Sequence, residues 1–359
     1  MVYRFHKKSA IILPIPSLKN WESWATIASR FMWNKLVHVK DIRKQNKYPP
    51  LPPRHGLGAT RARVPDGDPI NAWDFIWHLV STQRHRHPDD NENAVSERFT
   101  SGEVVDADGT PIDPSEELQP GIDVFFYRRP APETRVPYSI RTVYEDSGIL
   151  VVHKPPFLAT MPRASHITEN VTVRLRRATG NEELTPAHRL DRMTSGLLLL
   201  TKRASLRGAY QELFARREVN KLYEAIADDK GLTPTTWEHH IEKNEGELAS
   251  RIIPDAEPNA LTYLNSVEPI PGHPGAARYL LQPVTGRTHQ LRVQMDAAGV
   301  PIHGDGVYPE LLPAAGEDFG KPMMLTAVAL AFRDPVTKLP RCFTTNGYSH
   351  LPLPEPLFR

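Results

Sequence analysis

Runs of apolar residues predict most of the strands in this chain. Ile149–His153 and Gly196–Thr201 are almost wholly apolar, which is typical of strands that are buried on both faces. Other apolar or alternating runs, bounded by turn residues, predict half-buried strands. These further strands are expected at Gly102–Val105, Asp123–Tyr127, Ser139–Tyr144, Lys221–Ala227, Leu248–Ile253, Leu261–Val267, Arg278–Val284 and Met323–Phe332.

Apolar positions three or four residues apart predict three helices, at Asn71–Ser81, Asn170–Ala178 and Ala204–Arg217. In the third, Tyr210 and Phe214 share one face. Strands follow one another with little helix between them, which argues against a doubly wound parallel sheet. The predicted fold class is α+β, with a mixed, largely antiparallel sheet flanked by helices and preceded by a small α+β module.

Proline clusters at 49–53 and 130–137 divide the chain, because proline lacks the donor that regular structure needs. The expected parts are a basic extension (1–50), a small module (51–130) and a large catalytic unit (131–359). The small module contains a polar insertion, Arg84–Glu92, which we expect to be a solvated loop. Its spaced histidines lack the carboxylate framework of a metal site.

The net charge of +2 hides an asymmetry. Residues 1–50 carry ten Lys or Arg against two acidic residues, which leaves 34 basic and 40 acidic residues for the rest. Together with Trp21, Trp24 and Trp33, the extension could bind phosphates and stack on bases. The competing interpretation is a solvated or ill-ordered terminus.

No apolar run approaches the ~18 residues that a membrane helix needs. The apolar stretch 10–15 is interrupted by proline and resembles no secretory signal. A single cysteine, Cys342, excludes an intrachain disulfide and a multi-cysteine zinc site, and we expect it to be a small buried side chain. A cytoplasmic location follows as the expectation.

Motifs for nucleotide cofactors and common hydrolases are missing. Gly56-Leu57-Gly58 lacks a third glycine, and no Gly-Lys-Ser/Thr triplet occurs. The kinase-like segment 188–191 lacks the accompanying Asp-Phe-Gly, and Gly-x-Ser-x-Gly is absent. A nucleotide cofactor, a kinase and a serine hydrolase are therefore not expected.

Asp191 is the strongest candidate for that chemistry. It lies between Arg189 and Arg192, just before the buried strand at Gly196–Thr201. A carboxylate flanked by cations at a sheet edge is a candidate nucleophile or base. A structural ion pair is the alternative that these residues leave open.

The segment around Asp191 resembles the aspartate motif of RluA-type RNA pseudouridine synthases. Asn220–Ala225 resembles the tyrosine motif of that family, Gly286–Gln294 with Pro301–Asp305 its arginine motif, and Leu150–Pro156 its opening strand. The aspartate segment itself is His188-Arg189-Leu190-Asp191-Arg192-Met193-Thr194-Ser195-Gly196-Leu197-Leu198-Leu199-Leu200-Thr201-Lys202. The likeness spans roughly 138–345.

Residues 71–128 bear a fainter resemblance to the S4-type RNA-binding module. Together the two likenesses imply an isomerase that converts uridine in RNA to pseudouridine without cofactor or metal. Ribosomal RNA is the favoured partner and transfer RNA the second, and we expect a monomer.

By this resemblance the catalytic residues are Asp191, Tyr223 and Arg292. Asp191 attacks the sugar carbon or removes a ribose proton, and Arg292 pairs with it. Tyr223 stacks on the flipped base and assists proton removal at C5; the alternative is a core aromatic. Arg189 is expected to fill the gap in the RNA, or else to contact phosphate. The other expected RNA- or substrate-binding residues are Lys154, His188, Lys202, Arg287, His289 and Gln290.

Two segments depart from the family pattern: Gln294, where histidine is common, and Phe157–Pro162. Two other functions remain open. One is a catalytically inactive RNA-binding or assembly factor on the same fold. The other is a glycosidase, which needs a second carboxylate about 5 to 9.5 Å from Asp191, with Asp305 as the candidate.

Overall fold

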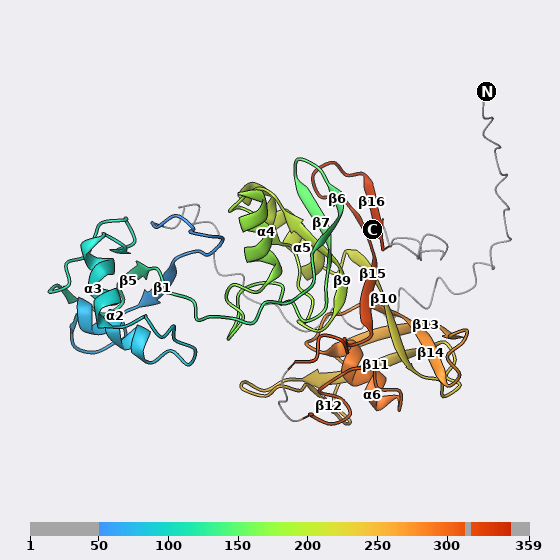
Figure 1. Cartoon of the computed structure of the whole chain (residues 1–359). Coiled ribbons are helices and arrows are strands. Elements are labelled where there is room, and N and C mark those ends of the chain that lie inside the picture. The colour runs from blue at the N-terminus through green and yellow to red at the C-terminus, as the bar shows by residue number, and fades with distance from the viewer. Residues whose placement is uncertain (1–49, 313–316, 346–359) are drawn as a thin grey trace. The chain divides into compact units, whose positions relative to one another are not determined.

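The computed structural model describes residues 50–312 and 317–345. The chain divides into two units, 1–46 and 47–359. The first unit lies outside the described residues. Of the predicted extension 1–50, only residue 50 is described, so its three tryptophans also lie outside the described residues. The following description concerns the second unit (Figure 1). None of its described helices is long and apolar enough to span a membrane.

Residues 60–126 form a small α+β module with its own hydrophobic core. Its helices are α2 (Ala72–Ser81) and α3 (Glu92–Thr100). Asn71 caps α2 by accepting hydrogen bonds from two backbone N–H groups of the first turn. The strands are β1 (Thr60–Arg63), β2 (Ile70–Asn71), β3 (Val104–Val105), β4 (Glu117–Leu118) and β5 (Asp123–Phe126), paired as β1-β5-β3 and β2-β4.

Helix α3 was not expected from the sequence, because one of its four buried positions is charged. Arg98 is buried and donates to Asp90 at 2.6 Å, to the Tyr127 carbonyl and to the Ala94 carbonyl. The sequence therefore shows no continuous apolar stripe here. Asp90 is buried too, so the expectation that Arg84–Glu92 is a solvated loop is wrong at Asp90, and Glu92 already belongs to α3.

The large sheet has the order β12-β11-β13-β14-β10-β15-β9-β7-β6, with β16 paired to β15 and β8 to β9. All described pairings in it are antiparallel except β9 with β15, which confirms the mixed, largely antiparallel sheet. Its strands are β6 (Arg141–Glu145), β7 (Ile149–Lys154), β8 (Thr185–Pro186), β9 (Ser195–Thr201), β10 (Val219–Asp228), β11 (Thr235–Glu242), β12 (Arg251–Ile253), β13 (Ala260–Pro269), β14 (Ala276–Pro283), β15 (Leu325–Arg333) and β16 (Pro340–Thr344).

Strands β7 and β9 are buried on both faces. Successive side chains of a strand point to opposite faces, so Leu197 and Leu199 join the core on the side of α5 (Arg207–Ala215). Leu198 and Leu200 join the core on the side of α4 (Val171–Thr179). This explains why the sequence shows a continuous apolar run here rather than an alternating one.

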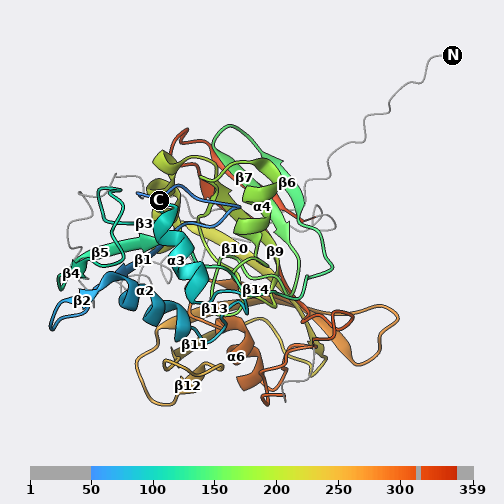
Figure 2. The same ribbon diagram turned by 60° about the vertical axis from the view of Figure 1, so that its left-hand side comes forward.

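The other half of the sheet is covered by α6 (Gln290–Ala297) (Figures 1 and 2). Leu291 and Met295 of this helix pack on Leu281 of β14 and Trp237 of β11. The sequence did not indicate α6 or β11. Of the six buried residues of this helix, three are apolar (Leu291, Val293 and Met295). The other three are the polar residues Gln290, Arg292 and Gln294, which interrupt the apolar pattern.

Three strands meet at Ala327 of β15. Ala327 pairs with Gly196 of β9 on one side and with Tyr223 of β10 on the other. Gly196 has a φ of 108°, and a Cβ there would lie 2.2 Å from the Ala327 carbonyl oxygen. Only glycine permits this approach, which joins the two halves of the sheet.

Other differences from the expected elements are local. The helix predicted at Ala204–Arg217 consists of a 3₁₀ turn (Ala204–Leu206) followed by α5. Strand β16 was also missed. It carries Cys342, which is exposed, so the expectation of a buried cysteine is wrong.

We predict that Gly196→Ala lowers the free energy of unfolding by about 3 kcal/mol or more, because the added Cβ clashes with backbone in a strained conformation. The matched control is Gly208→Ala in α5, where a Cβ meets nothing within 4 Å. It should be neutral or stabilise by about 0.5–1 kcal/mol. Urea titration measures both variants, and equal stabilities would contradict the close approach.

Candidate active site

The turn that carries Asp191 is held by backbone hydrogen bonds just before β9. Thr160 clamps Leu190: its hydroxyl donates to the Leu190 carbonyl at 2.8 Å and accepts from the Leu190 N–H at 3.1 Å. The Thr194 N–H donates to the Asp191 carbonyl at 3.1 Å. Thr160 belongs to the segment that departs from the family pattern, so the departure still supplies a hydroxyl that orients the turn.

Lys154 supports the same turn from below. Its side chain is buried, and its ammonium donates to the carbonyls of Pro155 (2.9 Å), Leu158 (2.7 Å) and Arg192 (3.0 Å). Burial lowers the pKa of Lys154 to about 7, against the opposing effect of the Asp191 charge. Lys154 therefore positions the turn and presents no charge at the surface, unlike the RNA contact expected from the sequence.

A cavity of about 490 Å³ opens beside Asp191. It brings together residues from the Asp191 turn, the end of α5, β10 and the start of α6. Among its lining residues Asp191 is the one carboxylate. The expected site residues that line it are His188, Arg189, Asp191, Tyr223, Arg287, His289, Gln290 and Arg292.

Tyr223 reaches the cavity through an irregularity in β10. The register between β10 and β15 shifts between Leu222 and Tyr223, as at a β-bulge, and such irregularities redirect side chains. Burial raises the pKa of Tyr223, and the negative charge of Asp191 raises it further. The phenol is therefore protonated at neutral pH and close enough to Asp191 to sense its charge.

Arg292 does not pair directly with Asp191, as the sequence had suggested. Its Nε and Nη2 donate to the two carboxylate oxygens of Asp305 at 2.7 and 2.6 Å, and both side chains are buried. Burial alone would lower the pKa of Arg292, but its bonds to Asp305 and the charges of Asp305 and Asp191 raise it. Arg292 thus acts on Asp191 only through its field.

Among the described residues, the basic side chain within 4.0 Å of the Asp191 carboxylate is His289, whose Nε2 lies 4.0 Å from Oδ2. His289 has a left-handed φ of 55° at the start of α6, and its Nδ1 lies 3.2 Å from the Tyr308 hydroxyl. Burial lowers the pKa of His289 to about 4, and the Arg292 charge contributes. The imidazole is therefore neutral at physiological pH.

His188 is also neutral. Burial and the nearby Lys221 lower the pKa of His188 to about 3, and its Nε2 accepts from the Leu199 N–H at 3.2 Å. Its ring stacks on Phe214 with 4.2 Å between centroids. His188 therefore forms part of the cavity wall rather than a charged contact.

The remaining expected residues differ in where they lie and in whether they can reach a ligand. Arg189 and Arg287 are exposed at the cavity, where they can reach a ligand. Gln290 lines the cavity but is buried, and its amide makes four hydrogen bonds within the protein, so its role is structural. Lys202 lies at the other end of β9, paired with Glu145 at 2.6 Å, and does not line the cavity.

Several site residues were not singled out from the sequence, because their partners are distant along the chain. Lys221 lines the cavity and donates to the Thr285 carbonyl at 2.9 Å, and burial lowers the pKa of Lys221 to about 8. Lys243, in the β11–β12 connection, interacts electrostatically with Asp191. Tyr308 contacts both His289 and Arg292.

Gln294, the other departure from the family pattern, is buried behind the site. It accepts from the Thr262 hydroxyl at 2.6 Å and donates to the Trp237 carbonyl at 3.3 Å. These bonds fasten α6 to β13 and β11. Gln294 is not among the residues that line the cavity, so the departure from the family pattern affects how the helix is held.

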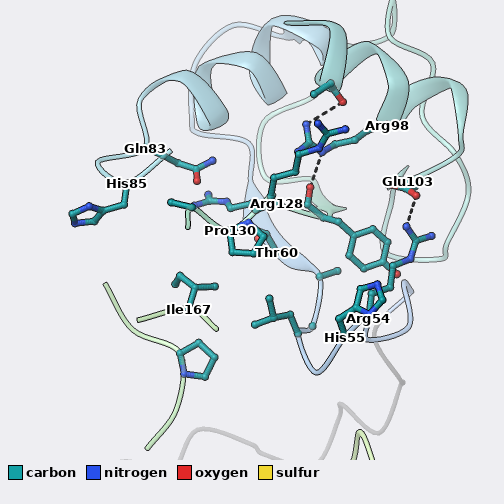
Figure 3. Close-up of a pocket in the computed structure, with 18 of the residues that line it drawn as sticks. Arg54, His55, Thr60, Gln83, His85, Arg98, Glu103, Arg128, Pro130 and Ile167 are labelled. Atoms are coloured by element: carbon teal, nitrogen blue, oxygen red, sulfur yellow. Dashed lines mark hydrogen bonds and ion pairs between the residues drawn. The ribbon is translucent and has the colours of Figure 1, made fainter. Parts of the chain in front are cut away.

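A second and larger cavity, of about 1510 Å³, lies away from Asp191 (Figure 3). Arginines predominate among its charged lining residues. Three of them are paired: Arg54 with Glu103, Arg98 with Asp90 at 2.6 Å, and Arg129 with Glu97 at 3.0 Å. Arg84 and Arg128 are exposed and have no ion-pair partner among the described residues. This cavity therefore has an excess of positive charge.

Comparison with known proteins relates the chain to RNA-modifying enzymes. Residues 148–297 match the family model described as RNA pseudouridylate synthase. The chain is 32% identical over 209 residues to the dual-specificity RNA pseudouridine synthase RluA of Pasteurella multocida, covering 55% of this chain and 88% of that protein.

Two further relatives differ in the RNA that their names specify. The ribosomal large subunit pseudouridine synthase D of Neisseria meningitidis serogroup B is 27% identical over 274 residues, covering 69% of this chain and 70% of the relative. The tRNA pseudouridine(31) synthase of Saccharomyces cerevisiae is 30% identical over 186 residues, covering 46% of this chain and 45% of the relative.

We predict that Asp305→Asn lowers the free energy of unfolding by about 3–5 kcal/mol, because it breaks a buried ion pair and leaves Arg292 without a charged partner. Asp191→Asn should change stability by less than about 1 kcal/mol, since its carboxylate makes no close ion pair. Chemical denaturation compares the two. Equal losses would indicate that Arg292 depends on Asp191 as much as on Asp305.

Proposed function

This chain belongs to the RluA-like RNA pseudouridine synthases, which isomerise uridine in RNA to pseudouridine, and we propose that Asp191 performs this reaction on ribosomal RNA. The observation that carries the proposal is that Asp191 is the one carboxylate lining a cavity that also contains Tyr223. Ribosomal RNA is favoured over transfer RNA because the relative named for the ribosomal large subunit aligns with 69% of this chain, against 46% for the tRNA enzyme.

The reaction breaks the bond between N1 and C1′, turns the base and joins C5 to C1′. A stacked base cannot be handled in this way, so the uridine must first be flipped into the cavity at a cost of a few kcal/mol. Asp191 then attacks C1′ or removes a ribose proton. Lys154, Lys243 and Arg292 each interact electrostatically with Asp191, so three basic side chains lie close enough to sense its charge.

Tyr223 provides the surface on which the flipped base stacks. Its raised pKa disfavours the phenolate, so the ring is present as a neutral phenol when the base arrives. Any part that it takes in removing the C5 proton follows the turning of the base. Arg189, exposed beside Asp191 at the cavity, is the candidate to occupy the gap that the flipped uridine leaves in the RNA.

The geometry disfavours the two alternative functions. A glycosidase needs a second free carboxylate, but the candidate, Asp305, is buried and accepts both hydrogen bonds of Arg292. An inactive RNA-binding factor does not require Asp191, Tyr223 and Arg292 to line one cavity, which they do. We further propose a cytoplasmic monomer; the single cysteine fits a reducing compartment.

The small module is proposed to hold RNA that flanks the target. Arg84 and Arg128 support this, because they line the larger cavity, are exposed, have no ion-pair partner among the described residues and can bind phosphates. The proposal concerns affinity and leaves the chemistry to the smaller cavity.

We predict that Asp191→Asn abolishes pseudouridine formation while RNA affinity stays within a few-fold, because the amide keeps the shape of the carboxylate but cannot act as nucleophile or base. The measurement is a map of pseudouridine in total RNA from cells lacking the gene, restored with wild type or variant. The control is Asp255→Asn, an exposed turn residue. Activity in Asp191→Asn would overturn the assignment of Asp191. If cells lacking the gene lose only a site in transfer RNA, the proposed substrate changes from ribosomal to transfer RNA.

We predict that Arg84→Gln and Arg128→Gln weaken RNA binding and each reduce the slope of log affinity against log salt by about 1, as expected for one lost phosphate contact. Arg61→Gln is the control, because Arg61 is paired with Asp123 and does not line the cavity. Fluorescence anisotropy with labelled ribosomal RNA fragments measures the slopes. Unchanged slopes in both cavity variants would remove this surface from the RNA path.

A further inference from the structure

Tyr308 lies directly behind the active site, and no role follows for it from the family motifs. Its ring is buried, 5.3 Å from the Arg292 guanidinium carbon, and its edge meets the ring of His289. The carboxylate of Asp305 accepts from the backbone N–H of Val307 and, at 3.3 Å, from that of Tyr308. The ion pair that holds Arg292 therefore also fixes the backbone of Tyr308.

The Tyr308 hydroxyl has one proton and two possible acceptors. It lies 2.9 Å from the Ser250 carbonyl and 3.2 Å from Nδ1 of His289. The Ser250 N–H already donates to the same oxygen at 2.7 Å. A phenol can donate only once, so the direction of this bond decides the tautomer of His289.

The two arrangements differ at Asp191. If Tyr308 donates to Ser250, His289 donates from Nδ1 to the Tyr308 oxygen, and an unprotonated Nε2 faces the Asp191 carboxylate. If Tyr308 donates to His289, the proton is on Nε2 and faces the carboxylate 4.0 Å away. An N–H facing a carboxylate is attractive, whereas a lone pair facing it is repulsive, so an ionised Asp191 selects the second arrangement.

The imidazole of His289 is neutral at physiological pH, so the choice between its two tautomers remains. Burial lowers the pKa of His289 to about 4, so a single proton is shared between its two nitrogens at physiological pH. The separation of 4.0 Å is long for a hydrogen bond, and catalytic hydrogen bonds often tighten only in the complex with substrate. A movement of about 1 Å would bring the N–H into bonding range.

We propose that Tyr308 is a positioning residue that holds His289 in the Nε2–H tautomer. The imidazole then donates to one carboxylate oxygen of Asp191, which directs the other oxygen of Asp191 at the ribose. The inference rests on the proposed role of Asp191. It assigns a task to the Tyr308 hydroxyl that packing alone does not require. The Ser250 N–H anchors the Tyr308 oxygen, and the Ser250 hydroxyl donates to the Thr288 carbonyl at 2.8 Å, next to His289. The Ser250 carbonyl, 2.9 Å from the same oxygen, competes with His289 for the phenol proton, and the charge of Asp191 decides between them.

The test is a double-mutant cycle of Tyr308→Phe and His289→Ala. The substrate is RNA from cells that lack the gene, labelled with tritium at C5 of uridine, since C5 loses its hydrogen when it joins C1′. Each single variant should lower kcat at least about tenfold, with KM within about threefold. The double variant should be no slower than the slower single variant, because Tyr308 acts through His289.

Tyr279→Phe is the matched control. Tyr279 is fully buried, and its hydroxyl donates to the Asp228 carbonyl at 2.6 Å, remote from the cavity lining. It should lose stability like Tyr308→Phe but keep the wild-type kcat. Unchanged kcat in Tyr308→Phe, or losses that multiply in the double variant, would overturn the proposal.

A second comparison applies if Tyr308→Phe does not fold. His289→Gln can place an amide N–H near the position of Nε2, so it should be at least about tenfold faster than His289→Ala; equal rates would overturn the donor role. Asp191→Asn is assayed beside these variants. Activity there would refute the proposed function itself, whereas an inactive Asp191→Asn with a fully active Tyr308→Phe would refute only the role of Tyr308.

Discussion

The contact between Gly196 and Ala327 sets the geometry on which the site depends. Ala327 pairs with Gly196 on one side and Tyr223 on the other, so these two residues lie two strand spacings apart, about 9–10 Å. Asp191 precedes Gly196 by one tight turn. This row of three paired residues therefore places the Tyr223 ring and the Asp191 turn on neighbouring parts of the sheet. The row is possible because Gly196 has no side chain.

Around that row the protein buries an unusual amount of polar structure. Lys154, Arg292, Asp305, Gln290 and Gln294 are all nearly inaccessible, and each is satisfied by two or more hydrogen bonds. In a low-dielectric interior such groups are costly when unpaired but hold one arrangement firmly when complete. Arg292 and Gln290 line the cavity beside Asp191, and the other three hold the elements around it, so the cavity wall is set before RNA arrives.

The sequence predicted what depends on local pattern and missed what depends on distant partners. Strands β7 and β9 were evident from unbroken apolar runs, and the family motifs led to Asp191 and Tyr223. Helices α3 and α6 were missed because buried Arg98, Arg292 and neighbouring glutamines break the amphipathic pattern. The pairing of Arg292 with Asp305 involves residues whose contact only the folded chain defines. For the same reason Lys154 was expected to bind RNA or substrate, whereas its ammonium donates to three backbone carbonyls inside the protein.

The distribution of charge in the cavity also fits isomerisation better than hydrolysis. Hydrolysis of a glycosidic bond needs a second acid or base to activate water. Here the neighbouring carboxylate of Asp305 is occupied by Arg292, and burial lowers the pKa of His188 to about 3 and that of His289 to about 4, so neither is an imidazolium acid at physiological pH. His188 already uses Nε2 to accept from Leu199, and His289 is bonded to Tyr308. Among the described residues that line the cavity, no second carboxylate lies beside Asp191 to activate water, which is consistent with the proposed return of the released base to C1′ through C5.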